Sequence, residues 1–268
     1  MCRLLAYKGI PQSLDRLIDK PEHSLIVQGY QPREMTAGVI NADGFGIGWY
    51  HAHRDTEPFI YKHTLPIWND VNLPSLSRYV ETGCVLAYVR SATEKQSVSL
   101  SNCQPFQDGK LLFIHNGFID NFRNTLYKAI RDRLHLHIYQ SIDGTTDSEH
   151  IFALFSSELH THPELPLEVI LQRTLQILRG LAATAQTTVS ANIVISDGDR
   201  LISSRFAYGA AVPSLYWIEN SPDYPRSILL ASEPLFSGDW QTCPVQSIIT
   251  IESNLDLHIH PIPTSNVL

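Results

Sequence analysis

The sequence begins with Met1-Cys2-Arg3-Leu4-Leu5-Ala6-Tyr7-Lys8-Gly9, a stretch that combines a reactive side chain with a strand pattern. Residues 4–7 are apolar, and a turn-forming segment follows at 8–11, so the pattern predicts a short buried strand that ends there. Because the side chain of Cys2 is small, we expect removal of Met1 to leave this cysteine at the N-terminus. The strand would then hold Cys2 at the edge of a sheet.

An N-terminal cysteine can supply a nucleophile and a base from one residue. A free α-amine ordinarily titrates near pH ~7.7–8.0, so part of it is unprotonated at neutral pH. The neighbouring thiol then needs little help to become a thiolate, in the way that an N-terminal threonine is activated by its own amine. Cys2 is therefore a candidate nucleophile; the alternative is an ordinary small, buried cysteine.

The composition is that of a globular protein and argues against several classes of function. The chain has 268 residues, 43% of them hydrophobic and 18% charged, which is enough for a proper core. Its formal charge of −7 argues against nucleic-acid and anionic-membrane partners, and no apolar run is long enough to span a bilayer. The four cysteines are widely spaced without a CxxC motif, and charges interrupt the N-terminal apolar segment. We therefore expect reduced thiols, no signal peptide and a cytoplasmic location.

Three glycines alternate with large apolar residues at positions 44, 46 and 48, within the segment 41–50. Glycines at alternate positions remove the side chains from one face of a strand, so a neighbour can approach that face closely. The pattern favours a bulged strand packed against another element. The alternative is a strand that leaves room for Cys2 and its substrate.

Two apolar strand patterns end in residues that could bind a substrate. The pattern at 84–90 ends in Arg90, whose buried charge needs a partner, either in a structural salt bridge or in a ligand carboxylate that the guanidinium grips. The pattern at 111–114 runs into His115-Asn116-Gly117. These residues fit a tight turn, or an oxyanion hole formed by the Asn116 amide and a backbone N–H.

A helix pattern opens with the capping-box spacing Thr146-x-x-Glu149. Asp147 falls in its first turn, where a carboxylate is favourable in any protein. The functional alternative is that Asp147 pairs with a substrate ammonium.

The chain also contains four His-x-His pairs, and two histidines at this spacing share one face of a strand. They are His51/His53, His135/His137, His160/His162 and His258/His260. No third ligand at a zinc-site spacing accompanies them, so we expect no metal and no other cofactor.

The order of the elements indicates the fold class. Strand patterns come first, helical patterns follow at 121–134, 146–159 and 166–185, and strand patterns return after residue 186. No linker or repeat divides the chain. The order predicts an α+β protein, with two layers of antiparallel sheet and helices outside, as a single domain over residues 1–268.

Five motifs, in this order along the chain, resemble those of the class II glutamine amidotransferases. They are residues 1–5, Asp43–Trp49, Val89–Thr93, His115–Gly117 and Thr146–Glu149. These enzymes are N-terminal-nucleophile hydrolases, so the resemblance implies a four-layer αββα sandwich. Residues 231–235 are also similar to the stand-alone members, which include the γ-glutamyl hydrolase of ergothioneine biosynthesis.

The resemblance implies a role for each candidate residue. Cys2 would attack the γ-carbonyl of a glutamyl group while its own α-amine transfers the proton. Asn116 and the N–H of Gly117 would hold the oxyanion. Arg90 would bind the α-carboxylate, and Asp147 the α-ammonium.

The sequence also departs from the family pattern. Larger synthases of the family often have histidines where this chain has Tyr88 and Gln104, and Glu94 follows Thr93 where several relatives have histidine or glycine. These departures leave the acceptor coupling and the loop environment open, but not the nucleophile.

Because the resemblance takes up almost the whole chain, we expect hydrolysis of a small γ-glutamyl amide, with γ-glutamyl-hercynylcysteine sulfoxide as the favoured substrate. The alternatives are a glutaminase subunit that supplies ammonia to a separate synthase, and an inactive binding module. A homo-oligomer or a synthase partner remains open. Trp49, Tyr50, Trp68 and Tyr88 are candidates for an aromatic cage around the substrate's trimethylammonium group, with core packing as the alternative.

Overall fold

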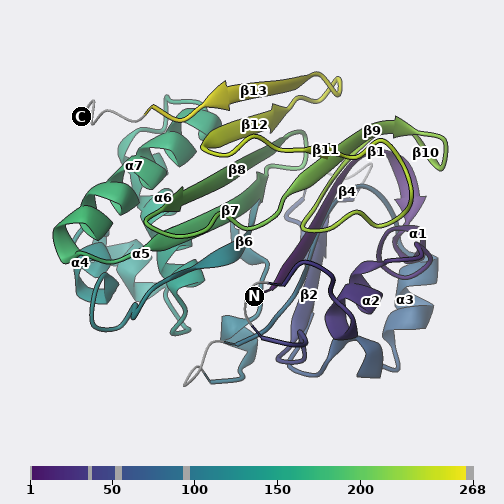
Figure 1. Ribbon diagram of the computed structural model, residues 1–268, viewed down its shortest axis with the longest axis horizontal. Coiled ribbons are helices and arrows are strands. Elements are labelled where there is room, and N and C mark those ends of the chain that lie inside the picture. Colours follow the sequence, from purple (N-terminus) through teal and green to yellow (C-terminus); the bar gives the residue numbers. More distant parts are fainter. Residues whose placement is uncertain (1, 36–37, 52–55, 93–96, 264–268) are drawn as a thin grey trace.

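The computed structural model describes residues 2–35, 38–51, 56–92 and 97–263. Two antiparallel sheets face each other, and each carries helices on its outer side (Figure 1). The α+β class and the αββα layering expected from the sequence are confirmed. The N-terminus lies between the two sheets, at the centre of the view in Figure 1.

The first sheet is built around the strand that begins at Arg3. Among the described residues it has seven strands, all paired antiparallel. In spatial order they are β11 (Gln241–Thr242), β9 (Tyr216–Ser221), β10 (Tyr224–Ala231), β1 (Arg3–Ser13), β4 (Glu81–Val89), β2 (Phe45–Trp49) and β3 (Phe59–His63).

Strand β1 is longer than predicted. It does not end at the turn-forming residues but continues to Ser13, and its register against β4 shifts between Lys8 and Gln12. A bulge therefore accommodates residues 9–11, and pairing with β4 overrides the local turn preference.

The second sheet contains six strands among the described residues, also antiparallel. In spatial order they are β13 (Leu257–Pro261), β12 (Ser247–Ile251), β8 (Leu201–Tyr208), β7 (Val189–Ser196), β6 (Leu111–Ile119) and β5 (Phe106–Asp108).

Among the described residues, three short helices cover the first sheet, and two short and two long helices cover the second. The first group is α1 (Leu14–Ile18), α2 (Leu25–Tyr30) and α3 (Leu73–Tyr79); the second is α4 (Tyr127–Arg131), α5 (Leu136–Gln140), α6 (Asp147–Thr161) and α7 (Leu167–Ala185). Single 3₁₀ turns form at Ile67–Asn69 and Leu100–Asn102. The helix expected at 166–185 is confirmed, whereas the pattern at 121–134 gives only α4 preceded by turns. Among the described helices, none combines the length and hydrophobicity that a bilayer crossing requires.

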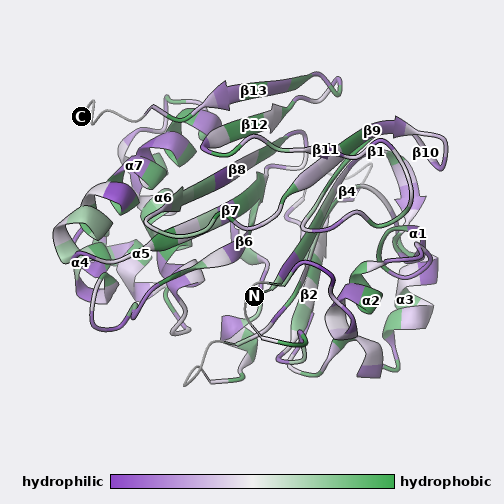
Figure 2. Cartoon of the chain, in the orientation of Figure 1, coloured by the Kyte–Doolittle hydropathy of each residue, from purple (hydrophilic) through white to green (hydrophobic). Residues whose placement is uncertain are grey.

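Alternation along β1 divides the core into layers. Leu5 and Tyr7 pack with α1, α2 and α3 on the outer side, while Leu4 and Ala6 face the second sheet. A third apolar layer lies between the second sheet and helices α6 and α7. Figure 2 shows that hydrophobic residues are concentrated along the central strands of both sheets, whereas the helices carry hydrophobic and hydrophilic residues in turn. Because Cys2 precedes Leu4 by two residues, the same alternation directs it toward the space between the sheets.

The glycines of β2 admit close neighbours. A Cβ at Gly46 would lie 2.0 Å from the carbonyl oxygen of Gln104, and one at Gly48 would lie 2.7 Å from Leu112 Cδ1. The packing interpretation of this segment is therefore confirmed. The bulge is not: β2 pairs in continuous register with β3 and β4.

Candidate active site

Cys2 lies half-buried immediately before β1, where the two sheets meet. The N–H of Ser91 donates a hydrogen bond to its Sγ at 3.3 Å, and Sγ lies 3.5 Å from the Ser91 carbonyl oxygen. The β1–β4 ladder ends with the pair Arg3 and Val89, so Cys2 and Arg90 are the residues that flank this last pair at the same end of the two strands. The strand register thus brings the candidate nucleophile to the candidate carboxylate-binding residue.

The phenol of Tyr88 lies beside this thiol. Tyr88 is buried and pairs with Leu4 on one side and Gly46 on the other. Burial raises the pKa of Tyr88 well above its ordinary value, and the nearby Cys2 raises it further, whereas Arg90 acts in the opposite direction. Tyr88 is therefore a neutral phenol at neutral pH.

The four aromatic candidates do not form one cage. Trp49 and Trp68 pack in the outer layer of the first sheet, where Trp49 lies against Phe59. Tyr50 and Tyr88 belong to the layer between the sheets. The core-packing alternative therefore accounts for the two tryptophans.

Arg90 is a buried cation at the end of β4. Its Nη1 donates to the carbonyl oxygens of Asp43 and Ser97, each at 3.3 Å. The Asp43 carboxylate in turn accepts a hydrogen bond from the N–H of Ala92 at 2.7 Å. Two loops, one before β2 and one before β5, therefore converge on this guanidinium.

His115, Asn116 and Gly117 lie within β6, so the tight-turn interpretation is wrong. The pairing of β6 with β7 continues past them to Ile119 and Val189. A Cβ at Gly117 would lie 2.0 Å from the Ser190 carbonyl oxygen, which explains why this position has no side chain.

The outer edge of β6 presents one open N–H. In an antiparallel strand, the N–H groups of alternate residues point the same way, so those of His115, Gly117 and Ile119 all point away from β7. The side-chain oxygen of Gln104 accepts from His115, and a carboxylate oxygen of Asp147 accepts from Ile119 at 2.8 Å. Within the described residues, the Gly117 N–H between them has no acceptor.

The amide of Asn116 connects the two sheets next to Cys2. Its Nδ2 donates to the hydroxyl oxygen of Ser232 at 3.2 Å, and the same oxygen accepts from the N–H of Leu4 at 3.0 Å. Asn116 is fully buried, and its Oδ1 has no partner among the described residues. By the alternation of β6, Asn116 faces the space between the sheets, as Leu112 and Ile114 do.

Asp147 is the first residue of α6. Its carboxylate accepts hydrogen bonds from the backbone N–H groups of Ile119 and Ser148, at 2.8 and 2.9 Å. The Thr146 hydroxyl caps the helix by accepting from the N–H of Glu149, which confirms half of the expected capping box. The charge of Asp147 also raises the pKa of both Tyr88 and His115.

His115 supports this arrangement and was not identified as a site residue from the sequence. Its Nε2 lies 3.1 Å from the Ser190 carbonyl oxygen, which can only accept, so Nε2 carries the proton. Its Nδ1 then accepts from the Ser148 hydroxyl at 2.9 Å. Burial lowers the pKa of His115, although Asp147 opposes this, which is consistent with a neutral ring.

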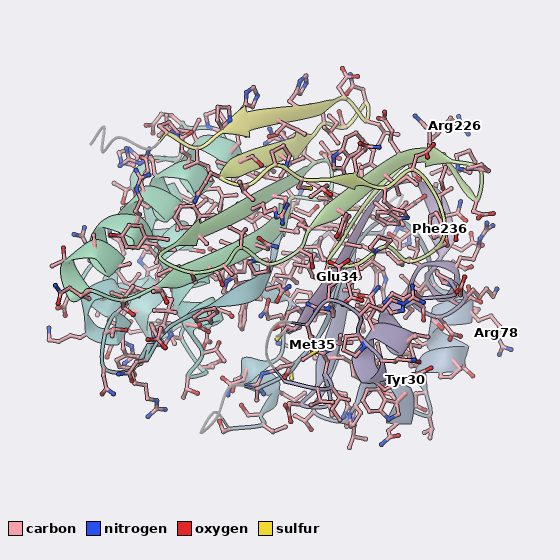
Figure 3. All side chains as sticks on the ribbon, in the orientation of Figure 1. Tyr30, Glu34, Met35, Arg78, Arg226 and Phe236 are labelled. Atoms are coloured by element: carbon pink, nitrogen blue, oxygen red, sulfur yellow. The ribbon has the colours of Figure 1, made fainter. Side chains whose placement is uncertain are left out.

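A buried ion pair fixes the segment that carries Cys2. Arg3 and Glu233, each only 1% exposed, form a salt bridge at 2.6 Å, and His23 lies 2.6 Å from the other carboxylate oxygen. Glu233 also accepts from the backbone N–H groups of Arg33 and Glu34. Figure 3 shows Glu34 close to the N-terminal end of β1. In the sequence, this pair could have been predicted from the single charged residue in each of two apolar segments, 2–7 and 228–235.

The histidine pairs form no metal site in the part of the chain that the structure describes. No group of three or more His, Cys, Asp or Glu side chains there is placed so that it could hold a metal ion. The rings of His258 and His260 lie 6.4 Å apart and those of His135 and His137 lie 6.1 Å apart. Met1, His53, Thr93 and Glu94 lie outside the described residues.

Comparisons with known proteins identify the family. The family model described as "Glutamine amidotransferases class-II" matches residues 1–231. "Probable glutamine amidotransferase DUG3" of Saccharomyces cerevisiae is 32% identical over 310 residues, covering 98% of this chain and 84% of that protein. The γ-glutamyl-hercynylcysteine sulfoxide hydrolase of Mycolicibacterium smegmatis is 29% identical over 270 residues, covering 97% of this chain and 98% of the relative.

A solved structure agrees with these relatives. The glutamine aminotransferase class-II domain protein from Silicibacter pomeroyi matches with a TM-score of 0.72 and 26% identity, covering 97% of this chain and 99% of that one. The resemblance drawn from five short motifs is thus confirmed. The chain belongs to the class II glutamine amidotransferases and is an amidohydrolase.

Proposed function

We propose that this protein hydrolyses the amide bond of a γ-glutamyl compound with Cys2 as nucleophile, within one glutamine amidotransferase domain over residues 1–268. After removal of Met1, the α-amine takes the thiol proton and the thiolate attacks the γ-carbonyl carbon. The amine passes that proton to the leaving nitrogen as the C–N bond breaks. Water then cleaves the thioester and releases glutamate.

The observation that carries this proposal is the single open N–H of Gly117 beside the buried amide of Asn116. The Asn116 side chain faces the space between the sheets, as Cys2 does, and Ser232 connects its amide to the N–H of Leu4, two residues after Cys2. The Gly117 N–H points out from the adjacent edge of β6. Two fixed donors aimed at the carbonyl oxygen would stabilise the tetrahedral oxyanion. Preorganised donors of this kind act strongly because they need not reorient during the reaction.

We assign recognition of the glutamyl group to Arg90 and Asp147. Arg90 is buried directly after Val89, which pairs with the residue that follows Cys2. A guanidinium in this position can hold an α-carboxylate with two hydrogen bonds. Asp147 would bind the α-ammonium, using lone pairs that its two backbone donors leave available. An analogue that lacks either charge would lose one of these two charge-assisted contacts and would bind poorly.

Among γ-glutamyl compounds we propose γ-glutamyl-hercynylcysteine sulfoxide as the substrate, acted on in the cytoplasm. Support comes from a relative named for this reaction that matches over nearly its full length, and from four cysteines that are all free thiols. The second candidate is a glutaminase that passes ammonia to another protein. It is favoured by the match to a protein named as a probable glutamine amidotransferase, which is 32% identical and covers 98% of this chain.

The test is glutamate release from a panel that includes glutamine, the sulfoxide and several γ-glutamyl amides. We expect turnover by wild type and none by Cys2→Ala, with intact mass showing that Met1 is absent. Faster release from glutamine than from the sulfoxide, and only with a second protein added, would favour the glutaminase. No release from any compound would refute both candidates and leave a binding module.

A further inference from the structure

A cavity that none of the candidate site residues lines lies next to the 3₁₀ turn at Leu100–Asn102, which contributes Ser101 to its wall. It encloses about 830 Å³ between the edges of β3 and β5 on one side and helices α5 and α6 on the other. Its walls are about equally polar and apolar, and the apolar part includes Ile60, Phe106, Ile138, Phe152 and Leu159. A cavity of this size accommodates a small organic ligand.

Two unpaired charges face this cavity from opposite elements. Lys62 of β3 lies in its wall, and within the described chain its ammonium forms neither a hydrogen bond nor an ion pair. Glu149 of α6 is only 8% exposed, and its Oε2 has no partner among the described residues. The two side chains do not reach ion-pair distance, so the space between them is available to a ligand.

A third polar group in the wall is also unsatisfied. The hydroxyl of Ser156, which lies two turns after Glu149 on α6, is also without a hydrogen-bond partner in the described structure. Ser156 is 5% exposed. Buried polar atoms without partners are rare and costly, so these two beside one cavity, with the half-buried ammonium of Lys62 across from them, point to a missing ligand. Burial also lowers the pKa of Lys62 and raises that of Glu149, which shows that neither charge is well solvated where it lies.

We propose that this cavity binds a zwitterionic amino acid or dipeptide with an apolar side chain. Its ammonium would face Glu149, its carboxylate would face Lys62, and its side chain would lie against the apolar wall. A ligand with only one charge would leave the opposite residue unpaired. The remaining carboxylates at the cavity, Asp108 and Asp143, are exposed at its rim and are hydrated without a ligand.

A chain of hydrogen bonds joins this cavity to Arg90. Glu149 Oε1 accepts from the N–H of Gly144 at 3.0 Å, and the neighbouring Thr145 N–H donates to Asn102 Oδ1 at 2.9 Å. Asn102 Nδ2 donates to the Ser97 carbonyl oxygen, which also accepts from Arg90. A ligand that moves Glu149 would therefore alter the residue that holds the glutamyl carboxylate.

The test measures binding by calorimetry to the full-length Cys2→Ala protein, so that it does not depend on turnover or on the function proposed above. The probes are L-phenylalanine and glycyl-L-phenylalanine. Their controls are 2-phenylethylamine, which lacks the carboxylate, and 3-phenylpropionate, which lacks the amine. We expect each control to bind at least about tenfold more weakly than the zwitterions, because each leaves one wall charge unpaired.

Two variants locate the site. Lys62→Met keeps the length of the side chain and should weaken the zwitterions but not 2-phenylethylamine. Glu149→Gln keeps the acceptor for Asp143 and Gly144 and should weaken the zwitterions but not 3-phenylpropionate. Asp108→Asn removes a rim charge and should change nothing. Equal binding of charged and charge-deleted probes, unchanged binding in both variants, or no binding of either zwitterion would overturn the proposal.

Inhibition of wild type separates two sources of the ligand. If the zwitterion is the amine that the enzyme releases, L-phenylalanine should compete with γ-glutamyl-L-phenylalanine but not with glutamine. If it is a free effector, it should change the KM for both substrates. Either result, abolished by Lys62→Met, supports the site.

Discussion

The Nδ2 of Asn116 lies 3.2 Å from the hydroxyl oxygen of Ser232, although 116 residues separate them in the chain. That hydroxyl oxygen also accepts a hydrogen bond from the N–H of Leu4. Ser232 therefore connects the candidate oxyanion donor to β1, the strand that follows Cys2 in the chain. A change at Ser232 should therefore affect the chemical step without contacting the substrate.

We expect Ser232→Ala to lower kcat by about 5–10-fold with little change in KM, the equivalent of one ordinary hydrogen bond of ~1 kcal/mol. Steady-state kinetics on a γ-glutamyl amide would measure this. Ser227→Ala is the matched control, because it removes an equally buried hydroxyl from the same segment at a site that faces Gly9. Equal kcat in the two variants would argue against the positioning role of Ser232.

Replacing Arg90 by methionine should raise the KM for γ-glutamyl amides by at least about tenfold, because a carboxylate loses its charged partner. The informative comparison uses 4-aminobutanamide, which is glutamine without its α-carboxylate. Wild type and Arg90→Met should hydrolyse this analogue with the same kcat/KM. A similar loss on both substrates would mean that Arg90 serves only to hold the loops at Asp43 and Ser97.

The Glu233 carboxylate should control both stability and its dependence on acid. Burial alone would raise the pKa of Glu233, but His23, the N–H groups of Arg33 and Glu34, and Arg3 together hold it below its ordinary value of 4.5. Its stabilising contribution is therefore complete above that value and is lost as the pH falls through the lower folded-state pKa.

We expect Glu233→Gln to lower the free energy of unfolding by ~3–5 kcal/mol at neutral pH, because Arg3 remains buried without its counter-charge. Urea unfolding at about pH 7 and about pH 4 would measure this, and the variant should lose less than wild type over that interval. Exposed Glu22→Gln is the control and should behave as wild type. An equal acid slope in Glu233→Gln would contradict the assignment.

Protonation of His150 should lower the free energy of unfolding as the pH falls. Burial lowers its pKa from 6.5 to about 4, with Arg131 adding to this effect. The unfolded chain therefore binds the proton more readily than the folded chain, and stability should decrease as the pH falls from about 6.5 to about 4, by up to ~3 kcal/mol. Unfolding curves across this range should flatten in His150→Gln, and an unchanged pH profile would show that other groups dominate.

Much of the fold followed from local pattern, but the support of the site did not. The apolar run that begins at Leu4 and the helical spacing of apolar residues along α7 are properties of adjacent residues, so this strand and this helix could be predicted directly. The roles of Gln104 and Ser232 depend on partners that only the folded sheets bring near, His115 and Asn116. No local propensity contains that information.

The errors have the same origin. The turn-forming residues 9–11 stay in β1 because two neighbouring strands pair with it, and the Asn-Gly pair at 116–117 stays in β6 because β7 supplies a partner on one side. In both places long-range pairing overrides local turn chemistry. At 121–134 the error is the reverse, because turns replace most of a helix that the pattern predicted. Only α4 is a regular helix there.

The way Gln104 and Asp147 occupy the outer edge of β6 has a consequence for what can reach the enzyme. A bare sheet edge is a template onto which a foreign polypeptide can add as an extra strand. Here two side chains take the outer N–H groups and leave a gap one donor wide. Such a gap has room for one carbonyl oxygen but offers no run of free N–H groups to an extended peptide, so we expect this edge to resist the addition of a foreign strand.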